Sequence, residues 1–162
     1  MPDRGRSPRL SLRLAQAADR DFLFELYRDS QATDFALLPL SGAQGDFLVR
    51  MQFQAREAGY HATFPDAADR IILGSGKPVG RLLVASSELE IRIVDLAVMS
   101  TERGAGAGSF AISEVFSEAA VLHKPVRLSV LRSNLRAACL YRRFGFRDTS
   151  ENQVYVEMEW AN

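Results

Sequence analysis

The 162-residue sequence is poor in the residues that build disulfides and metal sites, and it has no excess charge of either sign. A single cysteine excludes a disulfide within the chain and any cysteine-based metal site. The two histidines lie far apart in the sequence, which argues against a zinc site, so no metal is expected. The 20 Lys and Arg side chains balance the 20 Asp and Glu side chains, which argues against binding nucleic acid or a membrane surface through overall charge.

Long apolar runs are also missing. No run approaches the length that spans a bilayer, and the polar, arginine-containing residues 1–9 lack the apolar core of a signal peptide. We therefore expect a soluble, cytoplasmic protein with a disordered tail at residues 1–9 and a single domain at residues 10–162. Because 47% of the residues are hydrophobic, such a domain can build a full core.

The most informative stretch is residues 98–109, VMSTERGAGAGS. It follows the mostly apolar residues 91–98, which predict a buried strand, and it precedes a predicted helix. The apolar face of that helix contains Ile112, Val115, Phe116, Ala119 and Leu122. Glycines at 104, 106 and 108 allow a tight turn and expose amide N–H groups at the helix N-terminus, where the dipole favours anions. With the positive charge of Arg103, the segment predicts a pyrophosphate cradle made of backbone.

Three other interpretations of this glycine segment fit less well. The dinucleotide fingerprint G-x-G-x-x-G fails by register, because its third glycine position is Ser109. The P-loop of nucleotide-dependent enzymes requires a lysine, which the segment lacks. A flexible Gly/Ala linker remains an alternative, although a linker need not lie between a buried strand and an amphipathic helix.

A second motif follows one predicted helix and one predicted strand later. Residues 134–146, NLRAACLYRRFGF, have the pattern Asn-x-x-Ala-x-x-x-Tyr and end in Gly-Phe. Together with Arg103-Gly-Ala-Gly-Ala-Gly108, this pattern resembles the two signatures of the GNAT superfamily of N-acetyltransferases. The resemblance is clear from about Gly80 to Phe146. One departure is Ser100, which stands where the family commonly has proline.

The resemblance implies an α/β fold, with a mixed, largely antiparallel twisted sheet flanked by helices. A V-shaped cleft between the central strands would hold the cofactor arm, and residues 10–162 would form one acetyltransferase domain. The implied acyl donor is acetyl-CoA. Its pyrophosphate would lie against Arg103, Gly104, Ala105, Gly106, Ala107, Gly108 and Ser109. Its pantetheine arm would pair with the backbone of Leu96, Ala97 and Val98, and would contact Asn134 and Ala137.

Tyr141 is the main candidate for a catalytic acid, by resemblance. The reaction needs a proton for the departing CoA thiolate, and a phenol near the sulfur can donate it. A tyrosine that only packs in the core is the competing interpretation. Asn134 or Ser133 is also expected to cap the helix that carries Tyr141.

Two carboxylates are candidates for the general base. Strict alternation along residues 89–98 puts Asp95 on one face with Ile91 and Ile93, where a lone buried carboxylate needs a partner or a function. Asp95 either takes a proton from the acceptor ammonium or forms a charge pair with Arg81 or Arg92. Glu90 is the second candidate, because family members often carry a carboxylate on this strand.

The remaining pattern predicts the other elements. A half-buried strand at 10–15 leads into a helix near Asp19, and residues 31–45 are expected to be irregular. A helix at 46–58 should end at Gly59. Residues 69–98 read as an antiparallel meander with a hairpin turn at 74–78. Residues 153–160 read as a final strand beside the one that starts at Val126, with Val154 on its apolar face.

The sequence thus predicts an N-acetyltransferase that moves an acetyl group from acetyl-CoA to a primary amine by direct attack in a ternary complex. A non-catalytic CoA-binding sensor or interaction module of the same fold is the alternative. The acceptor stays open among amine antibiotics, polyamines, amino acids, peptide N-termini and protein lysines. Homodimer formation also stays open, because no stripe in the sequence identifies an interface.

Overall fold

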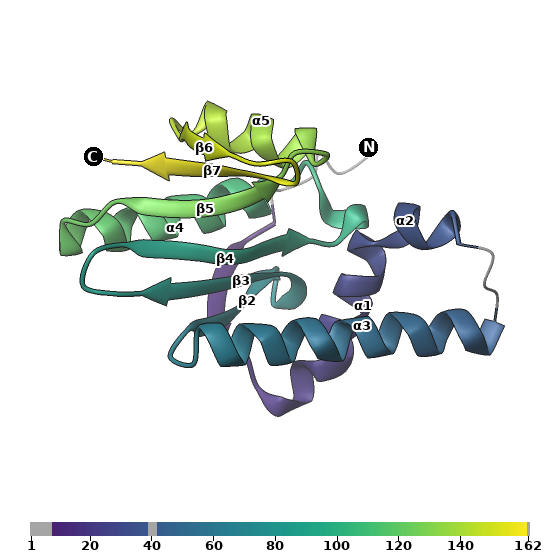
Figure 1. Ribbon diagram of the computed structural model, residues 1–162. Helices are drawn as coiled ribbons and strands as arrows, with labels where there is room; N and C mark the ends of the chain where they lie inside the picture. The colour runs from purple at the N-terminus through teal and green to yellow at the C-terminus, as the bar shows by residue number, and fades with distance from the viewer. Residues whose placement is uncertain (1–7, 39–41, 162) are drawn as a thin grey trace, which may run out of the picture.

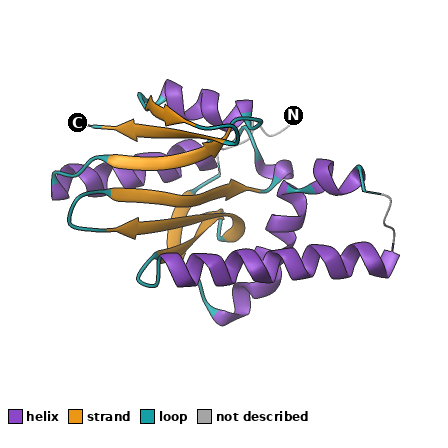
Figure 2. Cartoon of the chain, viewed as in Figure 1, coloured by secondary structure: helices purple, strands orange, loops and turns teal. Residues whose placement is uncertain are grey.

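The computed structural model describes residues 8–38 and 42–161, which form one seven-stranded mixed sheet flanked by helices (Figures 1 and 2). The strand order is β1-β2-β3-β4-β5-β7-β6. The strands are β1 (Leu10–Leu14), β2 (Ala68–Gly74), β3 (Lys77–Ser86), β4 (Ile91–Val98), β5 (Val126–Leu131), β6 (Arg147–Glu151) and β7 (Tyr155–Trp160). The α-helices are α1 (Arg20–Ser30), α2 (Ala32–Ala36), α3 (Gly42–Thr63), α4 (Ala107–Leu122) and α5 (Leu135–Arg143). Only β4 and β5 pair in parallel among these strands, so the expected largely antiparallel sheet is confirmed.

The main core lies between the sheet and the helices α4 and α5. Ile112, Val115 and Ala119 are buried there, as the helical pattern predicts. The same pattern is wrong for Leu122, which is 47% exposed in the last turn of α4. Phe116 is partly buried and stacks on Trp160 of β7 with ring centroids 4.0 Å apart, which joins the helix to the C-terminal strand.

Helices α1 and α3 cover the other face of the sheet and contain a second, smaller core. Phe24 of α1 and Phe53 of α3 meet edge to face with centroids 5.5 Å apart. Figure 1 shows α1 and α3 side by side, with α4 behind β4 and β5. Among the described residues, no helix has the length and apolar character needed to cross a bilayer.

A β-bulge in β4 overturns the predicted face of Asp95. The partners Leu83↔Asp95 and Val84↔Ile93 are consecutive on β3, so Val94 is an extra residue on β4. An extra residue reverses the alternation beyond it. Ile91 and Ile93 therefore face the core with α4, whereas Asp95 faces the α1/α3 side.

The two central strands separate soon after they begin. Parallel pairing of β4 with β5 extends from Ile91↔Val126 to Ile93↔Leu128 and goes no further. The rest of β4 remains paired with β3 as far as Gly80↔Val98. The separation leaves the β5-side edge of residues 94–98 without a strand partner, which agrees with the V-shaped opening implied by the family resemblance.

Several predicted element boundaries are corrected. Residues 32–36 form the helix α2 inside the segment expected to be irregular. Helix α3 continues through Gly59 to Thr63, so Gly59 is not its cap. Strand β6 was not predicted, because all five of its residues are exposed and no apolar alternation marks it. Val154 precedes β7 and is exposed.

The N-terminus is described only in part. Residues 1–7 of the predicted tail lie outside the described residues, while the carbonyl oxygen of Arg9 accepts a hydrogen bond from Ser75 N–H (2.9 Å). The hairpin turn predicted at residues 74–78 is present but shorter, because β2 ends at Gly74 and β3 starts at Lys77. Ser75 and Gly76 between them both have positive φ, the conformation of a tight two-residue hairpin loop.

Candidate active site

The glycine segment forms the predicted strand–turn–helix. After β4 ends at Val98, a short 3-10 turn, η2 (Ser100–Glu102), leads to Gly104 (φ 83°) and to Gly106 (φ 88°), the N-cap of α4. Both glycines occupy the left-handed region that other residues avoid. The first helical bond runs from Phe110 N–H to the Gly106 carbonyl oxygen (2.9 Å). The helix therefore begins with three amides that precede this bond, those of Ala107, Gly108 and Ser109.

This turn fits a pyrophosphate by shape and by donor type. A Cβ added at Gly104 or Gly106 would meet nothing within 4 Å, so the loop borders open space. Residues 103–106 are exposed, and Arg103 places a cationic side chain on the same turn. Helix N-terminal amides and a nearby guanidinium are the donors that phosphate oxygens accept.

The second motif forms α5 and its cap. Asn134 is the N-cap, and its Oδ1 accepts a hydrogen bond from Ala137 N–H at 3.1 Å. Asn134 is exposed and therefore accessible to a ligand. Its contact with pantetheine stays a prediction. The helix stops before Gly145, whose φ of 93° lets the chain turn back.

Tyr141 is brought to the inner face of α5, where it is only 7% exposed. Its ring meets Phe146 edge to face with centroids 5.6 Å apart. Among the described residues no hydrogen bond is formed by its hydroxyl group, yet that oxygen is not fully buried. Burial, and next the negative charge of Asp95, raise the pKa of Tyr141 above its usual value, so the phenol keeps its proton at neutral pH.

Asp95 lies in a small cavity of mixed polar and apolar lining between the sheet and the helices α1 and α3. Its carboxylate pairs with Arg56 (2.8 Å) and lies 3.8 Å from Arg81. Burial raises the pKa of Asp95, and the two guanidinium groups only partly oppose that effect. The cavity, of about 10 Å³, is lined by Leu23, Leu26, Tyr27, Ser30, Phe53, Arg56, Glu57, Arg81, Asp95 and Ala97.

A network of charged side chains surrounds Asp95. Arg81 is 4% exposed and binds Asp69 through two bonds (2.9 and 2.8 Å) and Glu57 through two more (2.5 and 2.9 Å). The sequence named Arg81 as a possible partner of Asp95, and the structure places it there. Arg92, the other suggested partner, pairs instead with carboxylates outside the cavity.

Arg56 and Tyr60 form a contact beside Asp95 that the sequence did not predict. Arg56 Nε donates to Tyr60 Oη (2.7 Å), and its guanidinium lies 5.2 Å from the ring centres of Tyr60 and Tyr27. Burial and the Asp95 charge raise the pKa of Tyr60 to about 12. The spacing of four residues on α3 was the available signal, but nothing local indicated that Arg56 reaches a strand 39 residues away.

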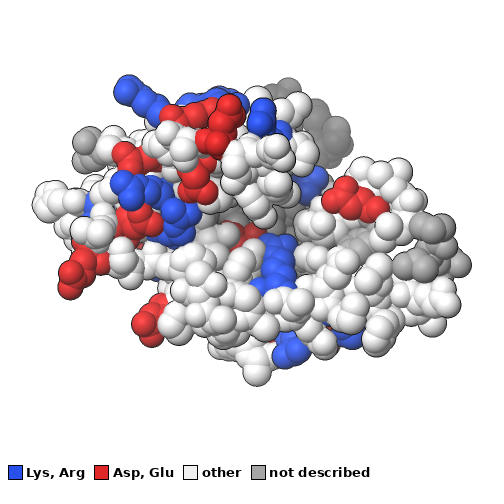
Figure 3. All heavy atoms as spheres, viewed as in Figure 1, with Lys and Arg blue, Asp and Glu red and all other residues white. Residues whose placement is uncertain are grey.

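Glu90 is not brought to this cavity. It precedes β4, at the end of the strand opposite to the glycine turn, and it pairs with Arg92 (3.1 Å) and Arg127 (2.7 Å). These residues belong to a band of mixed charge over β4, β5 and β7, visible in Figure 3. The same view shows a hollow near the centre of the molecule with charged atoms of both signs inside it.

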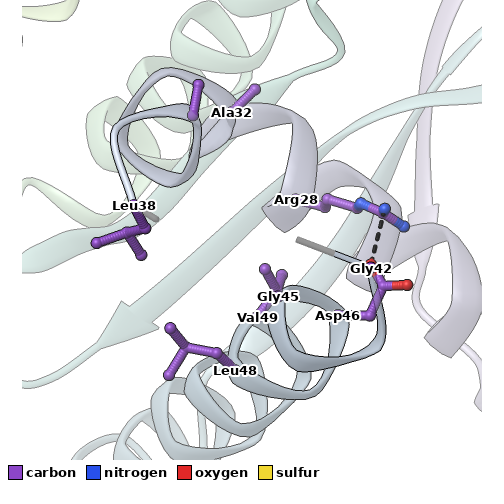
Figure 4. Close-up of a pocket in the computed structure, with 9 residues that line it drawn as sticks. Arg28, Ala32, Leu38, Gly42, Gly45, Asp46, Leu48 and Val49 are labelled. Atoms are coloured by element: carbon purple, nitrogen blue, oxygen red, sulfur yellow. Dashed lines mark hydrogen bonds and ion pairs between the residues drawn. The ribbon is translucent and has the colours of Figure 1, made fainter. Parts of the chain in front are cut away.

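A larger cavity, of about 330 Å³, lies between α1, α2 and the first half of α3 (Figure 4). Its walls are mostly apolar and include Ala32, Leu38, Leu48 and Val49. One wall carries the ion pair of Arg28 with Asp46 (3.0 Å). The two cavities lie along the same helix, because residues between 42 and 49 of α3 line the larger cavity and residues between 53 and 57 line the Asp95 cavity.

Comparisons with known proteins agree with this geometry. A model of the Acetyltransferase (GNAT) family matches residues 22–146. A PaiA N-acetyltransferase from Thermoplasma acidophilum, solved in complex with coenzyme A, is 16% identical with a TM-score of 0.73, over 95% of this chain and 99% of that chain. Ard1 from Thermoplasma volcanium is 22% identical with a TM-score of 0.65, over 93% and 96%.

A plant protein shares the same architecture. Arabidopsis thaliana Naa50, solved in complex with the bisubstrate analogue CoA-Ac-MVNAL, is 17% identical with a TM-score of 0.64, over 94% of this chain and 99% of that chain. At these identities the likeness concerns the fold. No curated protein sequence matches the chain.

Proposed function

The chain belongs to the acetyltransferase (GNAT) family, whose acyl donor is acetyl-CoA, and we propose that it transfers an acetyl group from acetyl-CoA to a primary amine by direct attack in a ternary complex. The observation that carries this proposal is the opening of the sheet beyond Ile93↔Leu128, where β4 leaves β5. Asp95 lies on β4 two residues after that pair, and its negative charge is the second cause, after burial, that raises the pKa of Tyr141 on α5.

The donor is expected to enter from the glycine turn. Its phosphates would accept hydrogen bonds from the amides at the start of α4, and its arm would lie along residues 96–98, where β4 has no partner on the β5 side. When bound, acetyl-CoA supplies the thioester carbonyl that the amine attacks. Backbone N–H groups of residues 96–98 can polarise that carbonyl and stabilise the charge that develops on its oxygen.

Asp95 is the proposed base. An ammonium must lose a proton before its nitrogen can attack, and Asp95 has a raised pKa and lines a cavity beside the opening. Glu90 is a poor choice, because β4 and β5 are still hydrogen-bonded at Ile91, next to it. The charged side chains at Asp95 carry one net negative charge when all are ionised. They are Arg56, Arg81, Glu57, Asp69 and Asp95. That balance favours a cationic acceptor.

Tyr141 is the proposed acid. Its hydroxyl keeps its proton at neutral pH, makes no hydrogen bond within the described chain and is not fully buried. It is therefore free to donate the proton to the departing thiolate sulfur. Most of the remaining rate enhancement is expected from holding the two substrates together in one cleft.

The proposal is tested first by binding and then by turnover. Thermal unfolding with saturating acetyl-CoA should show a clear rise in Tm, about 2.7 kcal/mol of stabilisation at a hundred times Kd, whereas ATP should have no effect. Thiol release from acetyl-CoA is then measured with a panel of amines that includes short peptides, since Naa50 is solved with a peptide-containing bisubstrate analogue.

Tyr141→Phe separates an enzyme from a CoA-binding sensor. The variant should bind CoA as the unmodified protein does, but its kcat should fall by about a hundredfold or more. Binding of acetyl-CoA without thiol release for any amine would favour the sensor. No Tm shift with acetyl-CoA on folded protein would contradict the whole proposal.

A further inference from the structure

Ser100 links the glycine turn to helix α1. Its backbone N–H donates to Oδ2 of Asp29 (2.8 Å), and its hydroxyl group donates to Oδ1 of the same carboxylate (2.6 Å). Asp29 lies in the last turn of α1, 71 residues earlier in the sequence. One side chain of α1 thus holds both the backbone and the side chain of a residue in the turn after β4.

The sequence gives no local reason for Asp29 to be where it is. A carboxylate in the last turn of a helix is disfavoured by the helix dipole. The two bonds from Ser100 compensate for this cost, because hydrogen bonds to a charged acceptor are stronger than neutral ones. Ser100 is also the residue that departs from the common proline, and proline has neither the N–H nor the hydroxyl group that bind Asp29.

The link connects the two halves of the candidate site. Ser100 starts η2, which leads through Glu102 to Arg103 and the glycine turn. Helix α1 lines the Asp95 cavity with residues including Leu23 and Ser30, the latter directly after Asp29. Whatever fixes the glycine turn therefore also acts on α1, which lines the Asp95 cavity. Because Asp95 is the proposed base for the acceptor amine, α1 is called the acceptor-side wall.

We propose that Asp29 is a positioning residue that fixes the cofactor turn to α1, so that CoA binding at the turn also orders the acceptor-side wall. This inference rests on the proposed function, since it requires CoA to bind at the glycine turn. In the ligand-free protein the link pre-organises the turn for CoA, which lowers the ordering cost of binding. By linkage, an acceptor that orders α1 strengthens CoA binding by the same factor.

The sequence offers a substitution that tests the Ser100–Asp29 link directly. Met99, the residue before Ser100, has φ −50° and ψ 136°, and this ψ lies in the range that a residue before proline adopts. Ser100 begins a 3-10 turn, whose φ proline also accepts. Ser100→Pro removes both donors, while Ser100→Ala removes only the hydroxyl group. Asp29→Asn keeps the size of the side chain and removes its charge, and Asp21→Asn in the first turn of α1 is the matched control.

The test measures CoA affinity by calorimetry and amide hydrogen exchange with and without saturating CoA. In the unmodified protein and in Asp21→Asn, CoA should protect residues 99–110 and also the last turns of α1. In Asp29→Asn and Ser100→Pro the turn should still be protected but α1 should not, and Kd for CoA should rise about fivefold. In Ser100→Ala, both the protection of α1 and the Kd for CoA should lie between those of the unmodified protein and those of Ser100→Pro.

The two main variants also distinguish positioning from charge. Asp29→Asn removes a negative charge that repels an anionic ligand, whereas Ser100→Pro leaves that charge in place. Weaker CoA binding in both variants supports positioning, and tighter or unchanged binding in Asp29→Asn overturns it. Equal protection of α1 in all variants, or none in the unmodified protein, also overturns the coupling while leaving the proposed function intact. A protein that binds no CoA overturns both.

Discussion

Gly106→Ala is expected to destabilise the protein for a purely conformational reason. Gly106 has φ 88° and ψ 5°, and an added Cβ would meet no atom within 4 Å. Any cost therefore comes from placing an L-residue in the left-handed region, about 1–2 kcal/mol. If the chain relaxes to avoid that strain, the amides at the start of α4 turn away from the ligand. Loss of about 1.4 kcal/mol of binding free energy would weaken CoA tenfold.

Two other glycines provide the controls. Gly76 in the β2–β3 turn also has positive φ (82°) and open space at Cβ, so Gly76→Ala should cost a similar unfolding free energy and leave CoA affinity unchanged. Gly108 is the second residue of α4 and has no positive φ, and a Cβ added there would touch Leu140 at an ordinary 3.6 Å. Gly108→Ala should therefore stabilise the protein by about 0.5–1 kcal/mol.

Urea unfolding and calorimetric titration with CoA measure the two quantities for each variant. An unchanged unfolding free energy in Gly106→Ala would refute the conformational argument. Equal loss of CoA affinity in Gly106→Ala and Gly76→Ala would show that affinity follows global stability rather than the geometry of the cradle.

Two further predictions concern ion pairs. Hydrogen bonds from Arg13 and from the Gln16 N–H lower the pKa of Asp19 from its usual 3.8 to about 2. These bonds therefore contribute about 1–2 kcal/mol of unfolding free energy, which is complete above pH 4 and is lost as pH falls towards 2. Asp19→Asn should flatten this part of the stability profile, measured by urea titrations at each pH. Arg81→Met leaves the partly buried carboxylates of Glu57 and Asp69 without their buried cation and should cost about 3 kcal/mol of unfolding free energy, measured at pH 7. A cost below about 1 kcal/mol would contradict a stabilising role of this network.

The parts of the site that the sequence predicted are those written in short segments. The glycine turn follows from three glycines between a strand and a helix, and the structure has positive φ at the first two of them. Asn134 was expected as a cap and is one, because a cap depends on residues within one turn. Tyr141 was expected on the helix that Asn134 caps, and it lies there as a buried residue.

The parts that were missed depend on contacts between distant segments. The bulge at Val94 is a property of pairing with β3, and alternation within β4 cannot show it. Arg56 reaches Asp95, and Asp29 reaches Ser100, only after α1 and α3 pack on the sheet. Strand β6 is polar and lies at the sheet edge, so its pairing with β7 leaves no hydrophobic trace in the sequence.

The short pairing of β4 with β5 has a mechanical consequence. The sheet consists of two antiparallel plates, β1–β4 and β5–β7–β6, each made from a continuous part of the chain. Three residue pairs between β4 and β5 join the two parts, and α4 packs against both strands. When the sheet is pulled apart across its strands, we expect the β4–β5 pairing to break first, because β3–β4 and β5–β7 are paired over more residues. A ligand that lies along the free edge of β4 would add contacts between the two parts of the sheet. The ligand-bound domain would therefore bend less at the β4–β5 pairing than the free domain.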